Sequence, residues 1–280
     1  MTATATATAL PDTVRLGLGR LIRSEWIKLR SIRSTVWCYA ILVAVTVGMA
    51  ALLGGAVGAP GSDVPQDALN GIFVSINTAS VSLTALVVGV LGVLIITGEY
   101  GTGQVRSTFT ADPGRTGVIL AKATVLAVTT FVVSIVSTWI GVLLSTALQS
   151  AKGADVAIGD PSVFLPILGS SVYVTLLALL AYGIGLLLRS SAGGIAVTVG
   201  ILLVLPIVLS GIGNLMRQQW VLDIAKFLPD QAGMQLYTYS YTGAQQDGVV
   251  LNGWGGFAVL VAEVVVIGAL ALSVASRRDV

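Results

Sequence analysis

The residue types that most often carry enzyme chemistry are scarce in this sequence. Its 280 residues contain no histidine and a single cysteine, Cys38. A clustered zinc site, a Cys/His or Ser/His/Asp triad and an internal disulfide are therefore all excluded. We predict that the chain has no catalytic site and binds no metal or other cofactor of its own.

The polar segment from Thr97 to Thr116 is rich in glycine but holds no nucleotide-binding motif. It lacks the glycine spacing and the Lys-Ser/Thr ending of a Walker loop, which cradles phosphates with backbone amides. Residues 104–111 follow two glycines and precede an Asp-Pro-Gly turn at 112–114, a pattern that predicts two turns of helix. We expect a short helix here, and no ATP site.

A basic segment with one acidic residue precedes the first long apolar run. At 100° per residue, the apolar side chains of residues 14–33 fall on one face and three arginines on the other, which predicts an amphipathic helix along the inner membrane surface. It is either an anchor to anionic lipid or a docking surface for a partner. Glu25 projects into the apolar face, and a pair with Lys28 would satisfy it. The candidate residues of this helix are Glu25, Trp26, Lys28, Arg30 and Arg33.

Glu263 lies near the middle of the last apolar run. An acidic side chain at that depth costs at least about 2.5 kcal/mol. It is therefore expected to face protein or water, or to be protonated. A role in substrate or proton movement is one interpretation, and a neutral carboxyl bonded to a neighbouring helix is the other.

Asn77 belongs to a group of small polar residues in the second apolar run. The group consists of Ser75, Asn77, Thr78, Ser80, Ser82 and Thr84. Such residues usually join membrane helices through close packing and interhelical hydrogen bonds. A polar pathway for a substrate is the alternative.

The chain that carries these residues is too apolar for a soluble protein. Hydrophobic residues make up 55% of it and charged residues 10%, against about 25% charged in soluble domains. Six runs are long enough to cross a hydrocarbon core about 30 Å thick, and each is predicted to be a helix because a lone strand leaves backbone groups unpaired in lipid. The runs lie near 36–57, 72–97, 117–148, 163–188, 192–212 and 254–276.

The predicted fold is thus an all-α integral membrane protein. Residues 15–280 are expected to form one transmembrane domain. The alternating Thr/Ala tract of residues 1–14 has no basic region followed by an apolar core, so it predicts a disordered tail and not a signal peptide.

The placement of Lys and Arg sets the expected orientation. Twelve of the 15 basic residues lie before the first run, around the start of the third, between the fourth and fifth, or after the last. The other three are Lys152, Arg217 and Lys226. Because cytoplasmic loops carry the excess of Lys and Arg, both termini are predicted to be cytoplasmic.

The loop from 213 to 253, on the predicted outer side, is long and aromatic. Its aromatic side chains are Trp220, Phe227, Tyr237, Tyr239 and Tyr241. Aromatic residues of this kind favour the membrane interface, and residues 215–228 have the pattern of a short helix stopped by Pro229. We predict re-entrant or interfacial helices before the last span, with a plain solvated loop as the alternative.

Three segments of the sequence, taken in their order and in their placement relative to the six spans, resemble a known family. They are the basic helix Ser24-Glu-Trp-Ile-Lys-Leu-Arg-Ser-Ile-Arg-Ser-Thr35, the Gly98-Glu99-Tyr100-Gly101-Thr102 turn leading to Pro113 and Lys122, and the closing Arg277-Arg278-Asp279. With them, the chain from about Leu21 onward resembles the permease subunits of type-2 ABC (ABC-2) transporters. It is most similar to the small six-span permeases of actinobacteria.

The resemblance implies two permease subunits, identical or different, side by side above two ABC ATPase subunits that bind ATP and Mg. It also implies that the first inner loop holds a coupling helix seated in a cleft of the ATPase. The Glu25 region matches the family's connecting helix, and the aromatic loop matches its re-entrant helices. The coupling residues by resemblance are Glu99, Gly101 and Thr102 in the turn, and Gln104, Val105, Arg106, Ser107, Thr108, Phe109, Thr110 and Ala111 in the coupling helix.

The expected function is therefore that of the membrane subunit of an ATP-driven exporter in the bacterial cytoplasmic membrane. Its substrate would be apolar or amphipathic, and its partners the ATPase, a second permease and the lipid bilayer, with no nucleic acid. One alternative is an ion-coupled secondary carrier that uses Glu263 as the coupling carboxylate. The other is a non-transporting sensor or scaffold whose aromatic loop faces a ligand.

Overall fold

The computed structural model describes residues 17–58, 64–103, 116–154, 157–241 and 248–277. All regular elements within these ranges are helical. They are α1 (Leu18–Ser31), α2 (Arg33–Ala56), α3 (Gln66–Thr78), α4 (Val81–Thr102), α6 (Thr116–Ser150), α7 (Pro161–Leu188), α8 (Ser191–Val199), the π-helical η1 (Gly200–Val204), α9 (Leu205–Met216), α10 (Gln219–Ala225), α11 (Pro229–Tyr237) and α12 (Gly253–Arg277).

Six helical stretches are long and apolar enough to cross a membrane, which confirms the predicted all-α fold with six spans. The second span differs most from its prediction. It was expected at 72–97, but α3 and α4 together run from Gln66 to Thr102. Gly98 and Glu99 continue the helix, because the Glu99 carboxylate is paired with lysines inside the protein and does not end the span in water.

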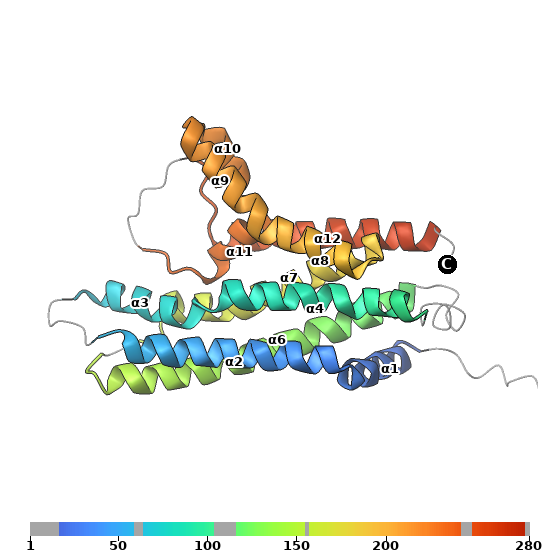
Figure 1. Ribbon diagram of the computed structural model, residues 1–280. Helices are drawn as coiled ribbons and strands as arrows, with labels where there is room; N and C mark the ends of the chain where they lie inside the picture. The colour runs from blue at the N-terminus through green and yellow to red at the C-terminus, as the bar shows by residue number, and fades with distance from the viewer. Residues whose placement is uncertain (1–16, 59–63, 104–115, 155–156, 242–247, 278–280) are drawn as a thin grey trace, which may run out of the picture.

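The spans other than the fifth run roughly along one direction (Figure 1), and glycines let the central pair, α4 and α7, approach closely. A Cβ atom on Gly92 of α4 would lie 2.4 Å from the carbonyl oxygen of Ala178 on α7, and one on Gly185 of α7 would lie 3.1 Å from the Cα of Val93. Small residues of this kind allow backbone-to-backbone packing in membranes. By contrast, a Cβ atom added at Gly48 of α2 would meet nothing within 4 Å.

The fifth span is interrupted by the five-residue π-helix η1. Pro206 lies two residues after η1. Proline has no N–H and clashes with the carbonyl four residues earlier, which here is Leu202 within η1. A π-helical turn is one of the ways a helix absorbs such a local change, and it is frequent at functional sites.

The aromatic region forms two short helices, but their bounds differ from the prediction. A helix was expected over 215–228, yet α9 ends at Met216 because Arg217 adopts a left-handed conformation with φ of 51°. Pro229 ends no helix but begins α11, where its missing N–H costs nothing. Figure 1 shows α9 and α10 projecting from the bundle, whereas α11 returns to contact α7 and α12.

The two ends of the bundle differ in charge. At one end, which we call the basic end, α1 lies beside the last turn of α4 and the first turns of α6, and α12 also finishes there (Figure 1). Lys152 lies at the opposite end, where its ammonium donates to the carbonyl oxygens of Gly54, Gly55 and Val57. It therefore caps the C-terminus of α2, in the way that cations near a helix C-terminus do.

Candidate functional site: a buried charge cluster at the basic end

Four charged side chains from three helices meet at the basic end of the bundle. Lys122 of α6 is ion-paired with both Glu25 of α1 and Glu99 of α4, the latter at 2.8 Å. Lys28 lies 2.9 Å from Glu25 and 3.3 Å from Glu99. Glu25, Glu99 and Lys122 are only 4, 7 and 6% exposed. Two carboxylates and two ammonium groups thus form one neutral, largely buried cluster, which we call the charge cluster.

The local structure of α1 explains how Glu25 reaches this cluster. The expected apolar face of this helix splits in two: Glu25 and Leu29 are buried against the protein, whereas Ile22 and Trp26 are exposed. The predicted pair between Glu25 and Lys28 is present, but it is part of the larger cluster. The exposed apolar residues remain available to the membrane interface, as expected of an amphipathic helix.

The helix bounds here also differ from the prediction. A helix was expected over 14–33, but α1 ends at Ser31 because Ile32 is extended, with ψ of 117°. Arg33 is therefore the first residue of α2. Arg30 stays on α1, with its guanidinium 5.9 Å from the centre of the Trp26 ring.

Glu99, assigned to coupling by resemblance, lies in the last turns of α4 and is buried against two lysines, so it does not face water at the end of the span. In the sequence, Lys122 contributed only to the family resemblance and to the count of basic residues near the start of the third span. Its role in the cluster was missed, because no local pattern marks a lysine that contacts two carboxylates 97 and 23 residues away.

The charge cluster is tightly packed. A space of only about 10 Å³ lies against Glu25, Lys28 and Lys122, which is at the lower limit for a single water molecule. The cluster therefore joins helices and offers no room for a substrate. Removing one partner from such a buried network leaves an uncompensated charge and is strongly destabilising.

Two further spans are tied to the same end by polar contacts. The buried hydroxyl of Tyr182 on α7 donates to the carbonyl oxygen of Ile119 on α6 at 3.1 Å. Ser191 at the start of α8 donates to Thr97 of α4 at 2.8 Å. Arg189, in the turn between α7 and α8, has its guanidinium 5.3 Å from the centre of the Tyr100 ring. The charge cluster is thus at the centre of a contact region that involves α1, α4, α6, α7 and α8.

The predicted coupling helix, residues 104–111, lies outside the described residues. Its attachment is visible, however, because α4 runs to Thr102 and Gly103 then adopts a left-handed φ of 72°. Gly101, matched to the family's turn, is still helical, and a Cβ atom added there would meet nothing within 4 Å. Glu99 therefore lies about one helical turn before the segment to which coupling was assigned.

A comparison with known families identifies the chain. The model of the family described as ABC-2 family transporter protein matches residues 21–211, which is more than half of the sequence. The chain belongs to the ABC-2 family. The match contains Glu25, Glu99 and Lys122, so all three helices of the charge cluster lie within the family region. No curated protein matches the sequence.

This chain is therefore the membrane permease component of an ABC transporter. The features C-terminal to Ile212, including α10, α11 and α12, lie outside the matched region. Within the family region, Asn77 donates to the carbonyl oxygen of Phe73 and accepts from Ser145 of α6 at 3.0 Å. It thus joins α3 to α6, as the helix-joining interpretation expects.

Glu263 of the ABC-2 permease lies midway along α12. One of its carboxylate oxygens is buried without a hydrogen-bond partner in the described part of the chain. No ion pair to Glu263 is present among these residues. Glu263 thus has a buried carboxylate oxygen but no basic partner in the described part of the chain.

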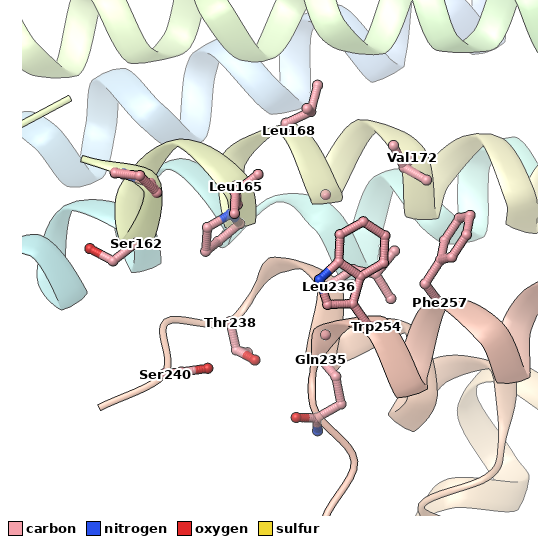
Figure 2. Close-up of a pocket in the computed structure, with 14 residues that line it drawn as sticks. Ser162, Leu165, Leu168, Val172, Gln235, Leu236, Thr238, Ser240, Trp254 and Phe257 are labelled. Atoms are coloured by element: carbon pink, nitrogen blue, oxygen red, sulfur yellow. The ribbon is translucent and has the colours of Figure 1, made fainter. Parts of the chain in front are cut away.

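Two cavities lie away from the charge cluster. The first, about 470 Å³, opens between α7, the end of α11 and the start of α12. Figure 2 shows its apolar wall on α7 facing the rings of Trp254 and Phe257, with the hydroxyls of Ser162, Thr238 and Ser240 nearer its rim. None of its lining residues is charged. The second, about 510 Å³, lies between α4, α7, η1–α9 and α11 and contains one acidic residue, Asp230.

Proposed function

We propose that this ABC-2 permease is the membrane subunit of an ATP-driven exporter of apolar or amphipathic molecules. It works with a separate ATPase subunit that binds ATP and Mg, and with a second permease, identical or different. The observation that carries the proposal is the charge cluster, which joins α1, α4 and α6 about one helical turn before residues 104–111.

The arrangement suits the transmission of force. A push on the segment after α4 moves the end of that helix, and the ion pairs of Glu99 pass the displacement to Lys122 on α6 and to Lys28 on α1. Packed interfaces respond to such pushes by switching between discrete arrangements and do not deform continuously. Several spans then shift together, which is what alternating access requires.

The same end of the protein would face the ATPase and therefore the cytoplasm. Among the residues that the structure describes, most Lys and Arg belong to elements at or near this end, and such an excess marks the cytoplasmic side. The exposed apolar residues of α1 would lie in the inner leaflet of the bacterial cytoplasmic membrane. The aromatic helices α10 and α11 would then be on the outer side.

The test is a mild-detergent purification of the tagged chain from native membranes, followed by mass spectrometry and an ATPase assay of the eluate. We expect a stoichiometric ABC ATPase. Glu99→Gln should reduce either ATPase retention or the stimulation of ATP hydrolysis by substrate, whereas Asp223→Asn, a matched loss of one carboxylate on α10, should change neither. An eluate free of ATPase, with transport that collapses along with the proton gradient, would instead support the carrier.

A further inference from the structure

The second cavity combines an apolar wall with a single polar corner. Its apolar residues come mainly from α4 and from η1 and α9 of the fifth span, and Leu83, Leu203 and Ile207 are about half exposed or more. The cavity is therefore open on the membrane-facing side of the single chain. Its volume of about 510 Å³ lies within the roughly 300–1,000 Å³ range of small-molecule sites.

Asp230 forms the polar corner from the first turn of α11. Its Oδ1 atom accepts from the Tyr173 hydroxyl at 3.4 Å, and its Oδ2 atom accepts from the Gln231 amide at 3.0 Å. Tyr173 itself is fully buried. A neutral hydroxyl and a neutral amide orient the carboxylate but leave its charge uncompensated.

No basic residue pairs with Asp230 in the described part of the chain. Lys226, one turn earlier on the chain, is committed to Asp223 and to the carbonyl oxygen of Val249. Burial raises the pKa of the Asp230 carboxyl, against the smaller lowering by its hydrogen bonds from Gln231 and Tyr173. A carboxylate held in this way is stabilised by any cation that enters the cavity.

The position of α11 is held by close backbone packing. A Cβ atom on Gly233 would lie 2.0 Å from the Tyr173 ring, and one on Gly256 of α12 would lie 2.2 Å from the carbonyl oxygen of Ala232. The short helix is therefore pressed against both α7 and α12. Asp230 is placed by rigid elements, which is the condition for a specific binding site.

We propose that this cavity binds amphiphiles with a cationic head, whose positive group lies at Asp230 and whose apolar body lies between α4 and η1–α9. This substrate class rests on the proposed function as an exporter. Charge complementarity selects a cation over a neutral or anionic molecule, because an anion would face an unpaired carboxylate at low dielectric. The first cavity, which has no charged lining residue, has no such preference.

The experiment compares two ions of nearly identical shape and opposite charge, tetraphenylphosphonium and tetraphenylborate. Binding of each is measured by equilibrium dialysis to the purified full chain in nanodiscs of zwitterionic lipid, without ATPase. We expect saturable binding of tetraphenylphosphonium and at least about tenfold weaker binding of tetraphenylborate. Asp230→Asn should weaken phosphonium binding about tenfold, while Asp223→Asn should not change it.

A second variant tests the cavity without altering its charge. Leu203→Trp fills the apolar wall and should also weaken phosphonium binding, with the melting temperature of each variant confirming that it is folded. Equal binding of the two ions to the wild type, or unchanged phosphonium binding by Asp230→Asn, would overturn the proposal. Because no ATPase is present, these results are independent of the test of the exporter function: a chain that binds the cation but retains no ATPase would contradict only the latter.

Discussion

Lys122 and Glu99 lie 2.8 Å apart on two different membrane-spanning helices, and both side chains are more than nine-tenths buried. Neither charge is tolerable alone at that position, since an isolated buried ion loses several kcal/mol of solvation. Their pairing, completed by Glu25 and Lys28, makes the ends of α1, α4 and α6 dependent on one another.

Replacing Lys122 by methionine should destabilise the protein by about 3–5 kcal/mol, because it leaves two buried carboxylates with only Lys28. Thermal unfolding in detergent, or denaturant titration, measures the change. Lys226→Met is the matched control, since its ion pair with Asp223 is partly exposed and should contribute no more than about 1 kcal/mol. Similar losses in the two variants would mean that the charge cluster does not hold the helices together.

Alkaline pH should loosen the connection of α1 to the bundle. Burial lowers the pKa of Lys28, but the hydrogen bonds and charges of Glu25 and Glu99 outweigh it, so that the pKa lies above 10.5. A raised pKa means that this stabilisation is fully present below 10.5 and is lost as pH rises through the folded-state value. Melting temperatures of the wild type should therefore fall above about pH 10.5 more steeply than those of Lys28→Met. Parallel curves would refute this role of Lys28.

Adding a methyl group at Gly92 should separate the two central spans. The new Cβ atom would lie 2.4 Å from the Ala178 carbonyl oxygen, a contact that only a backbone shift relieves, at about 1–3 kcal/mol. Gly48→Ala provides the control, because nothing lies within 4 Å of a Cβ atom at that position. We expect a lower melting temperature for the first variant alone.

Binding of tetraphenylphosphonium should weaken as the solution is acidified. The Asp230 carboxyl binds a cation only when ionised, and because burial raises its pKa above the ordinary 3.8, the midpoint of the loss should lie above that value. The other titratable groups around this position are Tyr173, Tyr237 and Glu263. Equilibrium dialysis of tetraphenylphosphonium across pH 4–8 should therefore show a midpoint in the loss of binding by the wild type. This midpoint should be absent in Asp230→Asn and present in Glu263→Gln.

Glu263 itself is expected to be dispensable for transport. Glu263 has no basic partner in the described structure. A glutamine has the same shape and keeps hydrogen-bonding capacity, so the Glu263→Gln variant should transport substrate at a rate within about twofold of that of the wild type. Uptake into inverted vesicles with ATP present gives the rate, and expression level gives the control for folding. Abolished transport would return Glu263 to the mechanism as a coupling carboxylate.

The sequence by itself determined the number of spans, their helical nature and the concentration of basic residues at one end. These properties are local: about 20 apolar residues are needed to cross a bilayer, and lipid permits a lone segment only as a helix. The basic entry helix and the segment around Glu99 also sufficed to indicate the ABC-2 family, which the match over residues 21–211 confirmed.

Only the tertiary structure decided which of these residues meet. Glu25 and Lys122 are 97 residues apart, and their contact depends on the rotation of three helices about their axes, which no sequence period reveals. The tertiary structure also decided the length of the second span, which extends to Thr102 because Glu99 pairs with lysines inside the protein. It likewise decided the end of α9 at Arg217, after which α11 places Asp230 at the second cavity. Local patterns specify helices, but pairing between helices depends on packing across the whole bundle.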